Sequence, residues 1–196
     1  MENWLQETSL TGNLVKLIPL RSEHKESLIK AASDGKLWQL WYTSVPSEKN
    51  IDTYMTDALE QKNKGTGLPF AVVNLLTDEI IGSTRFCNAE PKHRRLEIGY
   101  TWYAKSYQRT GSNTDAKYLL LQHAFEVLKC IAVEFRTNWF NQTSRKAIER
   151  LGAHQDGILR NHRLNEDGST RDSVVFSITQ QEWPSVKKSL KLKLNR

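Results

Sequence analysis

Cysteine is scarce in this chain of 196 residues: the two that occur, Cys87 and Cys130, lack the C-x-x-C spacing of metal and redox sites. We therefore expect both to be buried structural thiols. The histidines do not show the spacing that zinc ligands need. They are His24, His93, His123, His154 and His162. The sequence predicts no bound metal, and it offers no Cys–His arrangement for covalent catalysis.

Long apolar runs are also missing, because no run approaches the roughly 20 residues that a membrane helix needs. The first ten residues are mixed and contain Glu2 and Glu7, unlike a signal peptide. No internal repeat, low-complexity tract or linker divides the chain. We expect one domain over residues 1–196, located in the cytoplasm and not in a membrane.

Positive charge is unevenly distributed along the chain. The net charge is +6, and residues 187–196 supply five of these charges without any acid. The sequence therefore predicts a basic C-terminal tail over 187–196 that is solvated and attracts polyanions weakly. A dedicated nucleic-acid surface would spread its basic residues over the fold, so specific nucleic-acid binding is not expected.

Hydrophobic periodicity predicts alternating strands and helices. Strands are expected at 15–19, 70–75, 80–86, 96–102, 131–137, 158–162 and 173–178; helices are expected from Ser22, over 51–62, over 114–128, from Asn141 or Thr143 to Leu151, and optionally from Trp183. Antiparallel hairpins combined with strand–helix–strand units indicate an α/β mixed sheet with helices on its faces.

Residues 108–114, Q-R-T-G-S-N-T, form a short polar loop between the strand at 96–102 and the helix expected from Thr114. Such a loop presents main-chain N–H groups and the positive end of the helix dipole to an anion. No Gly-Lys-Ser/Thr follows and G-x-G-x-x-G is absent, which excludes a Walker loop and a dinucleotide fingerprint. The loop therefore predicts a phosphate-bearing cofactor.

The same loop resembles the Q/R-x-x-G-x-G/A pyrophosphate loop of the GNAT acyl-CoA N-acetyltransferase superfamily, with Asn113 where Gly or Ala is usual. Further segments resemble the RimJ/RimL type of ribosomal-protein N-terminal acetyltransferase over roughly residues 14–183. They are E-I-G-Y at 97–100, T-G-S-N-T-D-A-K at 110–117, N-Q-T-S-R at 141–145, R-L-G-A at 150–153, G-S-T-R at 168–171 and E-W at 182–183.

This resemblance implies a mostly antiparallel sheet of six to seven strands, split between two central parallel strands at 96–102 and 131–137. It also implies acetyl-CoA (coenzyme A) as co-substrate and a primary amine as acceptor. An extended pantetheine would pair with strand edges in the split. The cofactor-binding residues would be Thr101, Trp102 and Tyr103 by their backbone, Arg109, Thr110, Gly111, Ser112, Asn113 and Thr114 around the diphosphate, and Asn141 at the pantetheine amides.

Two residues are candidates for catalysis. Amine acetylation requires a neutral amine, and Glu97 is the candidate base because it lies on the strand that leads into the loop. The alternative is a surface salt bridge to Arg85, Arg94 or Arg95. Ser144 is the candidate donor to the departing sulfur, unless it only begins a helix. Asn141 has the same alternative as an N-cap, and Tyr103 and Tyr107 are rival acids.

The acceptor side is expected near residues 37–42, between the first two helices. Trp38, Trp41 and Tyr42 are the candidate substrate-binding residues because aromatic side chains suit a peptide or a cationic amine. Ordinary core packing is the alternative. Arg160 and His162 are further candidates to face the acceptor.

The sequence thus predicts an N-acetyltransferase that acts by direct attack of the amine on acetyl-CoA. Its acceptor is a protein N-terminus or a small amine, and it is a monomer or a homodimer. The alternative is a non-catalytic acyl-CoA-binding or polyanion-associated module on the same fold that uses the basic tail.

Overall fold

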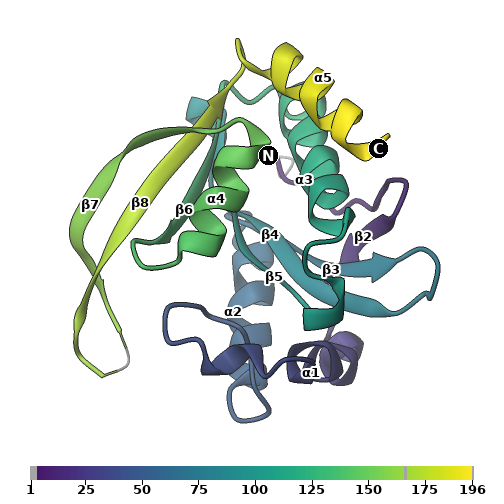
Figure 1. Ribbon diagram of the computed structural model, residues 1–196, viewed down its shortest axis with the longest axis vertical. Helices are drawn as coiled ribbons and strands as arrows, with labels where there is room; N and C mark the ends of the chain where they lie inside the picture. Colours follow the sequence, from purple (N-terminus) through teal and green to yellow (C-terminus); the bar gives the residue numbers. More distant parts are fainter. Residues whose placement is uncertain (1–3, 166, 196) are drawn as a thin grey trace.

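The computed structural model describes residues 4–165 and 167–195 and contains one mixed sheet of eight strands (Figure 1). Its strands are β1 Leu10–Thr11, β2 Val15–Pro19, β3 Leu68–Asn74, β4 Ile80–Glu90, β5 Arg95–Tyr103, β6 Ala132–Asn138, β7 His154–Leu164 and β8 Thr170–Thr179. They are ordered β1-β2-β3-β4-β5-β6-β8-β7. The predicted fold class is confirmed, with an additional strand because the short β1 pairs with β2 at the edge.

Helices cover both faces of the sheet, as predicted (Figure 1). They are α1 Lys25–Ser33, α2 Ile51–Asn63, α3 Ser112–Gln122, α4 Gln142–Leu151 and α5 Trp183–Leu194. One core lies under α1 and α2 and includes Leu28, Tyr54 and Trp102. The other lies under α3, α4 and α5 and includes Phe86 and Phe135. We call these two sides of the sheet the α1/α2 side and the α3/α4 side.

The centre of the sheet is split between β5 and β6. These strands are parallel and pair at three positions only, of which Glu97 with Glu134 is the last. Beyond it, β5 remains paired with β4 and β6 with β8, both antiparallel. A bulge at Tyr100, whose φ is +51°, bends β5 just where it leaves β6. The predicted split between parallel strands is therefore present.

The helix ends follow local chemistry. Asn141 caps α4, because its Oδ1 accepts a hydrogen bond from the Ser144 N–H at 3.0 Å. Gly152 ends the same helix with a φ of +101°, as the sequence predicts. The helix expected from Thr114 begins at Ser112 and continues after Gln122 as a π-helical turn, His123–Val127.

Residues 187–194 of the predicted basic tail continue α5, and the lysines at positions 188, 191 and 193 are exposed. Val186 and Leu190 lie one turn apart on α5 and are buried in the core with α3. Lys187 forms an ion pair with Glu126, and Lys193 donates to the main-chain carbonyl of Arg150. A count of basic residues does not detect the apolar residues Val186 and Leu190, which lie next to them at helical spacing.

Strands β7 and β8 form a long hairpin that projects from the rest of the sheet (Figure 1). Its predicted turn at residues 165–168 includes Glu166, which lies outside the described residues. Gly168 has a φ of +80°, and its N–H donates to the Asn165 carbonyl. Within residues 4–165 and 167–195, no helix combines the length and apolarity needed to cross a bilayer.

Candidate active site

The open edge of β5 presents main-chain groups to the split. The Ala104 N–H donates to Ile81 of β4, and the Trp102 carbonyl lies against Gly82 of the same strand. The main-chain N–H and C=O groups of successive residues point to opposite edges of a strand. Those of Thr101 and Tyr103 therefore face the split. The Tyr103 carbonyl already accepts from Gln108 Nε2 at 3.1 Å. The geometry thus favours Thr101 and the Tyr103 N–H as pantetheine partners and turns the Trp102 backbone away.

The loop at residues 108–114 leads from the open end of the split into α3. The Thr110 hydroxyl donates to the Tyr107 carbonyl at 2.8 Å and accepts from the Ser112 N–H at 3.2 Å. The N–H groups of Gly111, Asn113 and Thr114 have no acceptor within the described residues. Three uncommitted donors at a helix N-terminus make this loop a candidate anion site, and Arg109 beside them is exposed.

The loop is fixed to the start of β2. Asp115, which is buried, accepts from the N–H groups of Leu14 at 2.7 Å and Val15 at 3.1 Å. A Cβ atom added to Gly111 would lie 2.5 Å from Leu14 Cδ1. The obstacle to a side chain at position 111 is therefore the end of the exposed Leu14 side chain, and the φ of −68° does not itself call for glycine. Asp115 was missed from the sequence, although an acid in a first helical turn is a known stabilising signal.

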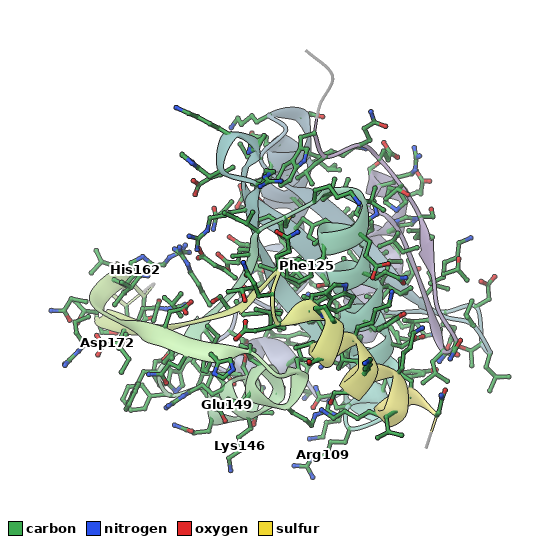
Figure 2. All side chains as sticks on the ribbon, turned by 90° about the horizontal axis from the view of Figure 1, so that it is seen from above. Arg109, Phe125, Lys146, Glu149, His162 and Asp172 are labelled. Atoms are coloured by element: carbon green, nitrogen blue, oxygen red, sulfur yellow. The ribbon has the colours of Figure 1, made fainter. Side chains whose placement is uncertain are left out.

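Helix α4 supplies the other wall of the cofactor side. The N-capping role of Asn141 leaves its amide nitrogen free to donate, so the two roles considered for it are compatible. The Ser144 hydroxyl has no hydrogen-bond partner among the described residues, and Ser144 is partly exposed. Arg150 of α4 donates to Thr114 of α3 at 3.2 Å. Figure 2 shows Arg109 and Lys146 projecting at the same edge of the molecule.

Glu97 occupies the last paired position before the split and is only 8% exposed. Its Oε2 accepts from Asn88 Nδ2 at 2.7 Å and lies 3.7 Å from Arg136 Nε. The salt bridges considered for it, to Arg85, Arg94 or Arg95, are not formed. Burial raises the pKa of Glu97 despite Asn88 and Arg136, which lower it. A carboxylate with a raised pKa is a better proton acceptor for an amine.

The two tyrosines differ in position. The Tyr103 hydroxyl is enclosed on the α3/α4 side without a hydrogen-bond partner in the described residues, and burial raises its pKa. The Tyr107 hydroxyl lies 3.4 Å from Thr77, in the connection between β3 and β4. Tyr103 therefore remains the rival proton donor, whereas Tyr107 points away from the split.

Lys117 of α3 is buried beneath the bulge. Its ammonium group donates to the hydroxyls of Thr84 on β4, at 3.2 Å, and Thr101 on β5. Burial lowers its pKa to about 7, because no carboxylate offsets the loss of hydration. Sequence reasoning missed Lys117. It lies three residues before the buried Leu120, so helical spacing places it on the same inner face of α3.

The aromatic candidates on the acceptor side separate into two groups. Trp38 packs against the core under α1 and α2, which agrees with the packing alternative. Trp41 is 60% exposed, and its ring lies 5.6 Å from the rings of both Tyr42 and Phe140. Because Phe140 precedes Asn141, Trp41 joins the acceptor segment to the start of α4.

The hairpin holds the remaining candidates. His162 shares a hydrogen bond of 2.9 Å with the Ser173 hydroxyl, and Arg160 forms an ion pair with Asp172. Figure 2 shows His162 and Asp172 together on this arm. Cys87 and Cys130 are buried and free, as expected.

A mixed sheet split between two parallel strands, with an amide-lined helix N-terminus at the open end, defines the architecture of a GNAT acetyltransferase. The family model for the acetyltransferase (GNAT) domain matches residues 15–154. The chain therefore belongs to the GNAT family, and it is an acetyl-CoA-dependent N-acetyltransferase.

Individual relatives agree with this assignment. YdaF of Bacillus subtilis (strain 168), provisionally named a ribosomal N-acetyltransferase, is 29% identical over 149 residues, or 75% of this chain and 80% of that protein. A structure from T. thermophilus, provisionally described as an acetyltransferase, is 33% identical with a TM-score of 0.84 over 97% of this chain and 99% of the other.

The predicted likeness to the RimJ/RimL branch is also confirmed. Mycobacterium smegmatis RimJ, solved in complex with CoA-disulfide, has a TM-score of 0.79 over 95% of both chains. At 21% identity this similarity concerns the fold. The roles assigned to individual site residues remain predictions.

Proposed function

We propose that this enzyme acetylates the α-amine of a protein N-terminus or a small primary amine, with the two substrates on opposite sides of the split. The observation that carries the proposal is the set of uncommitted N–H groups of Gly111, Asn113 and Thr114 at the open end of the split. These groups would hold the diphosphate of acetyl-CoA, and Arg109 would add charge. Thr101 and Tyr103 would pair with the pantetheine.

Glu97 would act from the α1/α2 side. The acceptor ammonium loses its proton to the Glu97 carboxylate, directly or through a water molecule, and its nitrogen then attacks the acetyl carbonyl carbon. Attack gives a tetrahedral intermediate, which collapses as the carbon–sulfur bond breaks; the nitrogen then loses its second proton and the departing thiolate takes up a proton from water. Ser144 would donate a hydrogen bond to the departing sulfur, and Asn141 would hold the neighbouring amide. The thioester supplies an activated acetyl group, so no covalent enzyme intermediate is needed.

The name of YdaF favours a ribosomal-protein N-terminus. The working unit that we propose is a monomer or a homodimer. The two free, buried cysteines suit the reducing cytoplasm, which we propose as the site of action.

A panel of amines tests this proposal. The enzyme is incubated with acetyl-CoA and peptides bearing free N-termini, polyamines or aminoglycosides, and free thiol is measured; the same peptides with blocked N-termini are the control. We expect thiol release with at least one free amine and not with its blocked form. Absence of release with every amine, together with no heat of coenzyme A binding in calorimetry, would contradict the assignment.

A further inference from the structure

Arg85 of β4 is buried in an unusual way, because it is only 1% exposed and forms no ion pair with the described residues. Its Nε and Nη1 atoms are enclosed and have no acceptor there. The guanidinium instead lies between two aromatic rings, 3.9 Å from the Tyr100 centroid and 4.7 Å from that of Tyr54. Cation–π contacts offset only part of the cost of burying a charge.

This stack is held rigidly. Tyr54 accepts from Trp102 Nε1 at 3.2 Å and donates to the Ser83 hydroxyl at 3.2 Å. Tyr100 is the bulge residue, and its left-handed φ of +51° keeps its ring over Arg85. Backbone strain of this kind costs of order 1–3 kcal/mol and persists where the surrounding structure requires it. The fold thus maintains an unpaired cation beside the point where β5 leaves β6.

Three more arginines face the same region from β6 and the hairpin. Arg163 of β7 lies directly opposite Arg171 of β8, a like-charge pair that destabilises a sheet. Arg171 is partly buried, and its Nε is enclosed without a hydrogen-bond acceptor in the described residues. Arg136 lies 3.7 Å from Glu97. Burial, and secondly Arg163, lowers the pKa of Arg171.

The available acids do not neutralise this group. Glu134 is shared between Arg95 and Arg136, and Asp172 is paired with Arg160. Among residues 4–165 and 167–195, Glu97 is the further carboxylate that faces Arg136 and Arg163, and it is the candidate base. Strand alternation places Glu97, Arg136 and Arg171 on the α1/α2 side, where the acceptor would approach. This surface repels polyamines and aminoglycosides and attracts an anion.

We propose that the acceptor amine carries a carboxylate, which Arg171 binds over the Tyr100 ring while Glu97 faces the amine. Arg85 lies beneath the ring, fixes its position and adds positive charge in a site poor in water. Arg163 strengthens the same field. This inference rests on the proposed function and specifies its acceptor class. The carboxylate belongs either to a free amino acid or to an acidic side chain close to a protein N-terminus.

Matched acceptors test the proposal in the whole enzyme. Ala-Glu-Ala-Ala is compared with Ala-Gln-Ala-Ala, and alanine with alaninamide, with each rate referred to the concentration of neutral amine. We expect kcat/KM to be about 10- to 100-fold higher for the acidic member of at least one pair, as one charged hydrogen bond provides. The peptide pair and the amino-acid pair distinguish the two sources of carboxylate. Equal values in both pairs, or a preference for polyamines, would overturn the proposal.

Variants identify the residues that cause the preference for an acidic acceptor. Arg171→Gln is expected to bring the ratio of the two kcat/KM values close to one, and Arg171→Lys to restore part of it. Arg85→Met should also lower the ratio; if that variant does not fold, Arg171→Gln alone decides. Arg21→Gln, an exposed arginine paired with Glu7, is the control and should leave the ratio unchanged. An unchanged ratio in Arg171→Gln contradicts the proposal. Absence of thiol release with every amine would instead overturn the proposed function and this inference with it.

Discussion

The α3/α4 side and the α1/α2 side of the split present different chemical groups to a substrate. On the α3/α4 side, the groups that would hold acetyl-CoA are mainly main-chain N–H donors of the loop and of the β5 edge. On the α1/α2 side, the groups near the split are charged side chains, including Glu97 and Arg171. Main-chain donors depend on the path of the backbone, so many sequences can form them. Side chains can be exchanged one at a time, so the acceptor side is where this chain can define its own substrate.

This contrast implies that the two sides can be damaged separately. The largest effect is expected on the α1/α2 side, from Glu97→Gln, which keeps the shape of the side chain and removes its basicity. We expect kcat/KM for the acceptor to fall by about 100-fold or more, within the usual range for a lost general base. Initial rates of thiol release measure this loss. Binding of coenzyme A, followed by calorimetry, should remain unchanged.

The pH profile distinguishes a base from a structural carboxylate. A protonated Glu97 cannot accept a proton, so the rate should fall as the pH decreases through its pKa, which burial raises. In Glu97→Gln this acidic limb should become shallower, because only the amine still titrates. A variant with lower rates but an unchanged profile would show that Glu97 acts through its contacts with Asn88 or Arg136.

A smaller effect is expected on the α3/α4 side from Gly111→Val. Its Cβ would meet Leu14 Cδ1 at 2.5 Å, so either the Leu14 side chain or the loop must move, and a shift of the loop would misalign its donors. We expect the Kd for coenzyme A to rise by about 10- to 30-fold, equivalent to about one hydrogen bond to a charged group. Leu14→Ala in the same chain removes the obstructing methyl groups and should restore most of the affinity. Failure of this rescue would mean that the loop does not act through its geometry.

The sequence was informative where the signal was contiguous. Residues 108–114 lie between a strand and a helix, so the anion site could be predicted from local chemistry, and the split followed from the resemblance. Arg85 could not be assigned, because its burial depends on Tyr54 and Tyr100, which are distant in sequence or held by a bulge. Strand alternation gives no indication of a bulge, and composition gives none of which charge remains unpaired.

The basic segment after residue 186 is a second case in which a contact distant in sequence decides the structure. A count of charges predicted a solvated tail, although Val186 and Leu190 recur at helical spacing and are buried. Tertiary contact with α3 decides the structure of this segment. Val186 and Leu190 pack against the apolar face of α3, and this packing stabilises the helix.

Lys117, like Asp115 on the same helix, departs from this pattern on the α3/α4 side, because it is an ionisable side chain held in the interior. Its pKa is about 7 when folded and near 10.5 when unfolded. Between these values the unfolded chain binds more protons than the folded chain, so the free energy of unfolding should rise with pH, by up to about 1.4 kcal/mol per pH unit. Below pH 7 both states carry the charge, and the folded state bears the cost of its burial.

Lys117→Met tests this assignment. The substitution removes the titrating group and keeps an apolar chain of similar length, so the rise in stability between pH 7.5 and 8.5 should disappear. Urea denaturation of both proteins at the two pH values measures the difference. An equal pH dependence in the two proteins would show that Lys117 stays charged in the folded protein throughout this range.

The smallest effect is expected from the exposed charges of α5. Deleting residues 187–196 would remove Leu190, which is fully buried, and a Leu→Ala change at such a site alone costs about 2–5 kcal/mol. Deletion therefore cannot separate charge from stability. Lys188→Gln with Lys191→Gln changes only exposed groups, so acetylation rates and Tm should stay within error while retention on heparin decreases. A loss of acetylation in this variant would place acceptor recognition on the α3/α4 side as well. The assignment of acetyl-CoA and the acceptor to separate sides would then be wrong.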